Sequence, residues 1–404
     1  MKKFSLLIAL TLMAGCIALS PSTAYAQDEK QDEFVRIWYD TCYGKKDTEK
    51  CYQLSKELIE KYPNNNYRKN AEGKVKQYEQ GKAWDKFQTA LKTYYTPPQD
   101  AAKLDQLFAA SEEYLKIDPN QQTVVGHMAV AGAKGAMGEV YKNLDKVKGY
   151  VETALKAFDS ITPPEGWKKE EWEPLREIVL AQMNQYLGWH LIMGTKGDQN
   201  QGLNYLTKAI QVRGKDGDGW KDPNNYYLRS AVYSNQYAEF RKSYDAMPDD
   251  QKTGDAGKEI LKKINELLDT KLIPEYARIL ATATKPETKG LYDFAKPEFD
   301  KLWEFRTGAK DKASDYVKNY VADPTIASVP IPAKPEDTSV LVAPTPTTGA
   351  ANVKLSTSGS AMAPSAKNAA NGSGKGAASS NGGKSTSTKG KGAKSGSKGK
   401  KKRG

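Results

Sequence analysis

The chain has 404 residues, of which 61 are basic and 49 acidic, and its formal net charge is +12. It contains only three cysteines and two histidines, which excludes a metal site built from several thiolates. After residue 26 no stretch is apolar over the roughly 20 residues that a membrane-spanning helix needs. We therefore expect no transmembrane span in the mature chain.

The first 26 residues have the three parts of a secretory signal peptide. Lys2 and Lys3 give a positive start, residues 4–19 are mostly apolar, and residues 24–26 form an A-x-A cleavage pattern. The apolar run is too short for a retained anchor helix. We expect an exported protein that is periplasmic or associated with the cell envelope, with secretion as a further outcome. Its mature chain is expected to begin at Gln27.

A second interpretation of this segment is a bacterial lipoprotein signal. The sequence "LMAGC" at residues 12–16 resembles a lipoprotein box, in which the cysteine is lipidated and becomes the mature N-terminus. Such boxes favour leucine where Met13 stands, and the A-x-A pattern that ends at Ala26 is better formed. Cleavage after Ala26 is therefore favoured, while lipidation of Cys16 stays open.

Removal of the signal leaves Cys42 and Cys51 as the cysteines of the mature chain. In "WYDTCYGKKDTEKCYQ" Cys42 falls in the last turn of one predicted helix and Cys51 in the first turn of the next. A tight loop around Gly44 is expected between them. These turns face each other in an antiparallel hairpin, and exported proteins mature in an oxidising compartment. We predict a Cys42–Cys51 disulfide, with two buried free thiols as the alternative.

Residues 28–322 are predicted to be almost entirely helical. Apolar residues recur at spacings of three and four, as at Trp84, Phe87, Leu91 and Tyr94. Clusters of Pro, Gly, Asn and Asp, which end one helix and cap the next, recur at 61–67, 94–100, 117–122, 161–167, 214–225 and 246–255. The sequence therefore predicts an all-α fold of paired helices.

One predicted pair carries a distinctive order of small and large residues. In "GDQNQGLNYLTKAIQV", residues 197–212, a turn at Gly197 is followed by small Gly202, large Leu206 and small Ala209. Residues 137–158 have a similar order, with Gly138, Tyr141, Ala154 and Ala157. This pattern resembles the tetratricopeptide-repeat (TPR) family. The resemblance implies a solenoid of helical hairpins, in which small residues let helices cross closely and stacked repeats bury one another's apolar faces.

The resemblance does not extend evenly over the predicted helical domain, residues 27–322. Its clearest repeats fall within residues 40–220. Residues 222–322 continue as long aromatic helices that depart from the pattern, so they are expected to form divergent repeats or a capping bundle. An irregular helical bundle without a true repeat is the alternative for the whole domain.

The composition changes after residue 322. Residues 323–347 contain six prolines and are predicted to be an extended linker. Residues 348–404 consist mainly of Gly, Ser, Ala, Asn, Thr and Lys, without any Phe, Tyr or Trp. Such a segment cannot bury enough apolar surface to offset the entropy of folding, so we predict a disordered tail.

The tail holds the excess positive charge of the whole chain. Twelve of the 61 basic residues follow Thr338, where no acidic residue occurs, so residues 1–337 contain 49 basic and 49 acidic residues. The basic residues nearest the end are Lys384, Lys389, Lys391, Lys394, Lys398, Lys400, Lys401, Lys402 and Arg403. We expect them to bind an anionic envelope surface or polymer. Without aromatic residues to stack on bases, specific nucleic-acid recognition is not expected, and a purely solubilising tail is the alternative.

No motif for catalysis or cofactor binding emerges from the sequence. His127 and His190 both fall in apolar helical stretches and are interpreted as core residues. The glycine-rich "GAKGAMG" at 132–138 lacks the lysine and hydroxyl residue of a phosphate loop, and "DGDG" at 216–219 lacks the glutamate of a calcium loop. We therefore expect neither enzymatic activity, nor a cofactor, nor a metal site.

TPR-like arrays commonly bind an extended peptide or a helix of a partner protein. On this ground Tyr186, Trp189 and His190, on one predicted helix, are candidates for a partner-binding face. The sequence thus predicts an exported, non-enzymatic scaffold with a protein partner. A lipidated, TPR-like lipoprotein acting in envelope or outer-membrane assembly is the second hypothesis.

Overall fold

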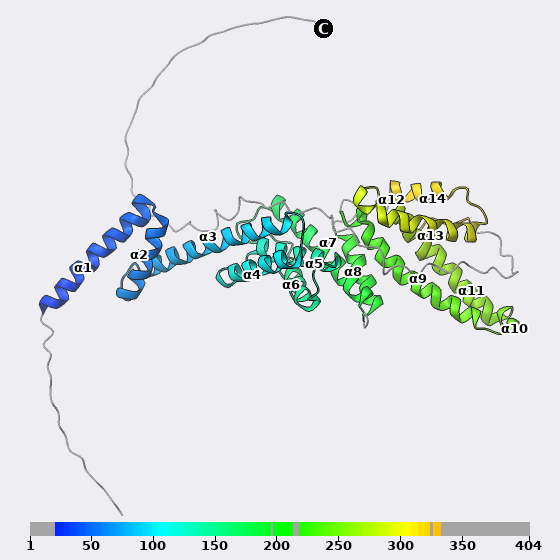
Figure 1. The fold of residues 1–404 in the computed structure, drawn as a ribbon, viewed down its shortest axis with the longest axis horizontal. Coiled ribbons are helices and arrows are strands. Elements are labelled where there is room, and N and C mark those ends of the chain that lie inside the picture. Colours follow the sequence, from blue (N-terminus) through cyan, green and yellow to red (C-terminus); the bar gives the residue numbers. More distant parts are fainter. Residues whose placement is uncertain (1–20, 195–196, 213–217, 324–325, 333–404) are drawn as a thin grey trace, which may run out of the picture. The chain divides into compact units, whose positions relative to one another are not determined.

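The computed structural model of the chain describes residues 21–194, 197–212, 218–323 and 326–332 (Figure 1). Within these ranges every regular element is a helix and no strand occurs, so the predicted all-α class is confirmed. The described helices belong to one unit within residues 1–365. Residues 1–20 of the predicted signal peptide lie outside the described residues.

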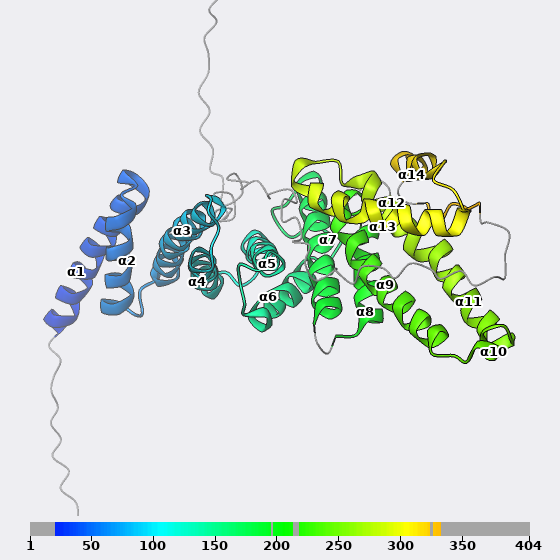
Figure 2. The ribbon, with the colours of Figure 1, turned by 45° about the vertical axis from the view of Figure 1, so that its right-hand side comes forward.

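Consecutive helices pack side by side through the first part of the chain. Each of α1 to α8 contacts the next helix along the sequence, and α8 contacts α9 (Figures 1 and 2). These elements are α1 (Pro21–Tyr39), the π-helical turn η1 (Asp40–Lys45), α2 (Thr48–Lys61), α3 (Arg68–Tyr95), α4 (Ala101–Ile117), α5 (Gln122–Met137), α6 (Leu144–Ala157), α7 (Lys169–Met193) and α8 (Gln199–Gln211).

The helix boundaries follow from local sequence signals. Four of the predicted turn clusters, at 61–67, 94–100, 117–122 and 161–167, fall at junctions between consecutive α-helices, and the cluster at 246–255 contains the short helix α10. Five helices begin at an acidic or amide side chain that accepts a hydrogen bond from the backbone two or three residues on, which satisfies an otherwise unpaired N–H group. These capping residues are Asp47, Asp100, Asn143, Asp198 and Asp222.

Glycines allow α7 and α8 to cross closely. A Cβ atom on Gly188 would lie 2.6 Å from Leu206 Cγ, and one on Gly202 would lie 2.7 Å from Ile192 Cγ1. At Gly197, in the turn between these helices, a Cβ would lie 1.7 Å from the carbonyl oxygen of Leu191. Neighbouring atoms therefore occupy the space that a side chain would need at these three positions.

Replacing Gly188 by alanine should lower the free energy of unfolding by about 1–3 kcal/mol, because the added methyl group overpacks the crossing. The matched control is Gly149→Ala on α6, where no atom lies within 4 Å of the added Cβ. There the same change should raise stability by about 0.5–1 kcal/mol, since alanine is the better helix former. Urea denaturation measures both values, and a stabilising effect at Gly188 would contradict the close crossing.

The C-terminal helices pack around a central one. They are η3 (Asp218–Lys221), α9 (Pro223–Asp245), α10 (Asp249–Lys252), α11 (Asp255–Leu267), η4 (Leu268–Leu272), α12 (Ile273–Thr282), η5 (Pro286–Thr288), α13 (Lys289–Thr307) and α14 (Ala313–Ala322). Every residue of α12 from Ile273 to Ala281 is buried, and α12 contacts α9, α13 and α14. This part of the chain is therefore a helical bundle built around α12.

The buried apolar side chains form two separate cores. The larger core includes side chains from α3 to α14. The smaller core is confined to the first hairpin and the start of α3, and it comprises Trp38, Cys42, Cys51, Leu58 and Ala71. Because this core is small, a covalent link has more to contribute to it than to the main core.

The structure corrects two details of the sequence analysis. Gly138 and Tyr141 lie in the connection between α5 and α6 rather than in the first helix of a repeat, and the Tyr141 hydroxyl donates to Asp105 at 2.8 Å. Residues 326–332, in the predicted linker, form neither helix nor strand, but they contact the helices rather than forming a free spacer. The rest of that linker from residue 333, and the tail at 348–404, lie outside the described residues.

Candidate partner-binding face

The three candidate residues lie on the last turns of α7, but they do not share one environment. Tyr186 is fully buried, and its hydroxyl donates to the carbonyl oxygen of Leu144 at 3.2 Å. Tyr186 therefore fixes α7 against α6 as a core residue. The prediction that its side chain faces a partner is corrected, because α6 covers the side of α7 on which it lies.

Trp189 and His190 are half-buried and reach the surface. Their rings both contact the buried Tyr186 ring, with centroids 5.7 and 5.9 Å away, and the His190 ring is nearly parallel to it. Met193, one turn beyond Trp189, is 41% exposed. We define the α7 face as Trp189, His190 and Met193. Met193 was not predicted, although its spacing of four residues from Trp189 on a helix is the signal that identifies it.

Two charged residues of α6, Asp145 and Lys148, act on His190 through their charges. Burial lowers the pKa of His190, Lys148 lowers it further, and Asp145 opposes the shift. The imidazole is therefore neutral at pH 7 and can both donate and accept a hydrogen bond. Large side chains with a polar handle and a polarisable thioether are typical of protein-binding surfaces.

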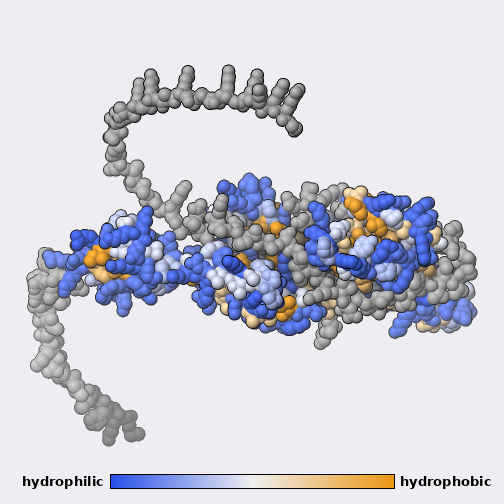
Figure 3. Space-filling model, turned by 45° about the horizontal axis from the view of Figure 1, so that its top comes forward, coloured by the Kyte–Doolittle hydropathy of each residue, from blue (hydrophilic) through white to orange (hydrophobic). Residues whose placement is uncertain are grey.

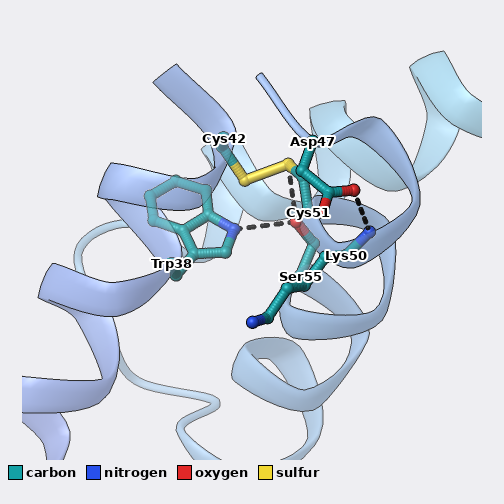
Figure 4. Close-up of a disulfide and its surroundings, with 6 residues drawn as sticks. All are labelled: Trp38, Cys42, Asp47, Lys50, Cys51 and Ser55. Carbon is teal, nitrogen blue, oxygen red and sulfur yellow. Dashed lines mark hydrogen bonds between the residues drawn. A yellow bond between two sulfur atoms is a disulfide. The ribbon is translucent and has the colours of Figure 1, made fainter. Parts of the chain in front are cut away.

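The predicted disulfide is confirmed: Cys42 and Cys51 are bonded, with their Cα atoms 4.9 Å apart (Figure 4). Beside it the Trp38 indole donates to Ser55 Oγ at 2.8 Å. The connecting turn differs slightly from the prediction. The chain stays helical through Gly44 and reverses at Lys46, whose φ is +55°.

His127 lies in the core, as predicted. It is 1% exposed, its ring contacts Phe87, and its Nδ1 atom has no hydrogen-bond partner among the described residues. Burial lowers its pKa to about 4. The histidine is therefore neutral in the folded chain over the whole physiological range.

This shift predicts a pH-dependent contribution to stability. In the unfolded chain the histidine titrates at its ordinary pKa of 6.5, so below that pH the unfolded state binds a proton that the folded state does not. The contribution is present above pH 6.5 and is lost as the pH falls towards 4. Between pH 7 and pH 5 the free energy of unfolding should fall by about 2 kcal/mol more than in His127→Leu. Urea denaturation at both pH values tests this, and parallel changes in the two proteins would contradict it.

A buried ion cluster, which no local sequence pattern indicates, joins α9 and α12. The Glu275 carboxylate is 1% exposed and pairs with Arg229 at 2.9 Å and with Arg278 at 3.1 Å. The Arg278 guanidinium also lies 4.9 Å from the centroid of the Tyr320 ring. One carboxylate thus balances two guanidinium groups in the interior of the C-terminal bundle.

A metal site and a membrane span each have requirements against which the described residues can be compared. In the ranges that the structure describes, no cluster of three or more His, Cys, Asp or Glu side chains could hold a metal ion. In those same ranges, no helix combines the length and apolarity needed to span a bilayer. The face in Figure 3 is mainly hydrophilic, with small and separate apolar patches. Cys16 and the nine basic residues from Lys384 to Arg403 lie outside the described residues.

Comparisons with protein-family models, with curated proteins and with solved structures find no match to this chain. The resemblance to TPR proteins therefore rests on the residues of this chain alone.

Proposed function

We propose that this protein is an exported, non-enzymatic scaffold whose TPR-like helical array binds a protein partner. Its polybasic tail holds it to an anionic component of the cell envelope. The observation that carries the proposal is the α7–α8 hairpin, where two glycines permit a close helix crossing beside the α7 face.

The hairpin supports a TPR-like arrangement for a physical reason. Gly202, Leu206 and Ala209 are all buried, and Leu206 fills the space beside Gly188. Small residues bring the two helices together, and the large residue fills the gap between them. The sequential contacts from α1 to α9 provide the stacking that such repeats need.

The α7 face supports protein binding over catalysis. Its Trp and Met side chains can bury apolar area, and aromatic anchors of this kind carry much of the energy of protein interfaces. If the face binds a partner, Trp189→Ala should abolish co-purification of that partner while leaving the helical content unchanged. Co-purification at the wild-type level would exclude a role for this face.

The positive charge of the tail supports the proposed location at the envelope, because it attracts the protein to anionic surfaces. Removing residues 348–404 should move the protein from the envelope fraction to the soluble fraction at low salt, because each lysine near an anionic surface contributes about 1 kcal/mol. A control chain of the same length, with the nine basic residues from Lys384 to Arg403 replaced by glutamine, should behave as the truncated chain does. Immunoblots of the two fractions measure the shift, and an unchanged distribution would exclude the tether.

A second candidate is a lipoprotein acting in envelope assembly, and the "LMAGC" sequence favours it. The two candidates differ in the mature N-terminus. Mass spectrometry of the purified protein distinguishes them, because a lipidated Cys16 and a free Gln27 cannot both be the first residue.

A further inference from the structure

The chain turns back on the helical bundle after α14. We call residues 326–332, with the sequence "IASVPIP", the C-terminal strap. They form neither helix nor strand, and Ile326, Val329 and Ile331 are half-buried against the main core. Ala327, Ser328, Pro330 and Pro332 are exposed.

Side chains of α12 and α14 bind the backbone of the strap. Arg278 donates to the carbonyl oxygen of Ala327 at 2.8 Å, and it also donates to the carbonyl oxygen of Ile326. The Tyr316 hydroxyl donates to the Val329 carbonyl at 3.3 Å, and the Val329 N–H donates to the Tyr320 hydroxyl at 3.2 Å. These contacts are made to the main chain of the strap rather than to particular side chains.

The groups that hold the strap are themselves fixed by the bundle. Arg278, Tyr316 and Tyr320 are all buried. The Arg278 charge is balanced by Glu275 at 3.1 Å, and the two tyrosine hydroxyls lie 3.2 Å from each other. Each of these side chains therefore has a partner within the bundle besides the strap, as expected of a preformed site.

We propose that α12 and α14 form a binding site for an uncharged, proline-containing peptide, and that the C-terminal strap is its ligand supplied in cis. A partner protein that displays a segment of this chemistry competes with the strap for the site. Extended proline-containing segments suit such sites, because their conformation is preformed and little entropy is lost on binding. This inference is independent of the α7 face and of the tail.

The test uses the full chain and a fluorescently labelled peptide of the sequence IASVPIP. Val329→Asp places a charge where the strap packs against the core, so it should free the site. Anisotropy should then show peptide binding at least about tenfold tighter than to the wild type, whose own strap occupies the site. The matched control is Ser328→Asp, which adds the same charge at an exposed strap position and should leave peptide binding at the wild-type level.

A further variant tests the recognition itself. Adding Tyr320→Phe to the Val329→Asp chain removes one hydroxyl that bonds the peptide backbone, and it should weaken peptide binding by about threefold or more. Equal peptide binding by the wild-type and Val329→Asp chains, or none by either, would overturn the proposal. So would loss of helical circular dichroism in the Val329→Asp chain, because the strap would then be an integral part of the fold rather than a ligand.

Discussion

Replacing Glu275 by glutamine should lower the free energy of unfolding by about 3–5 kcal/mol, which is the usual cost of leaving buried charges without their partner. Glutamine keeps the shape of the side chain but removes its charge. Arg229 and Arg278 would then face each other without the carboxylate that both contact at 2.9 and 3.1 Å. Urea denaturation followed by circular dichroism measures the loss.

The matched control for this substitution is Glu259→Gln on α11. Glu259 forms an ion pair with Lys263 across one helical turn, but its side chain is 66% exposed. Solvent screens such a pair, so the control should leave stability almost unchanged. Similar effects of the two substitutions would show that the Glu275 cluster does not stabilise the C-terminal bundle.

Removing the disulfide with Cys42→Ser and Cys51→Ser should destabilise the first hairpin by about 2–3 kcal/mol, the loop-entropy value for a loop of roughly ten residues. The two cysteines are nine residues apart and belong to the small core. Because this core is separate from the main one, we expect local opening rather than global unfolding.

Hydrogen exchange measured by mass spectrometry resolves the local effect. Protection of amides in α2 should fall by about 30- to 150-fold, which corresponds to the same free energy. Protection in α13, whose buried side chains belong to the main core, serves as the internal control and should not change. If α2 keeps its protection, the bond contributes nothing to the hairpin.

The features that the sequence predicted well depend on neighbouring residues. Helix ends were found because prolines, glycines and capping side chains act within one or two turns. The Cys42–Cys51 bond was found because both cysteines fall in adjacent turns of one predicted hairpin. The reversal lies at Lys46, two residues beyond the predicted Gly44, since a lysine in the left-handed region leaves no sequence signal.

The features that were missed depend on distant residues. Arg229 and Glu275 are 46 positions apart, and in sequence each resembles an ordinary charged residue on a helix surface. The C-terminal strap has the composition of a linker, and its contacts with distant buried side chains such as Arg278 and Tyr320 show that it is bound. Tyr186 and Trp189 differ in exposure because α6 covers one side of α7, which no local pattern reveals.

The central claim is that the α7 face binds a protein partner, and site-specific photo-crosslinking in intact cells tests it most directly. A benzoylphenylalanine at Met193 should give one discrete protein adduct, and adding Trp189→Ala should remove that adduct. The control places the same probe at Tyr292 on α13, which is 37% exposed against 41% for Met193, and it should not give that adduct. No adduct at Met193, or the same adducts at both positions, would contradict the claim.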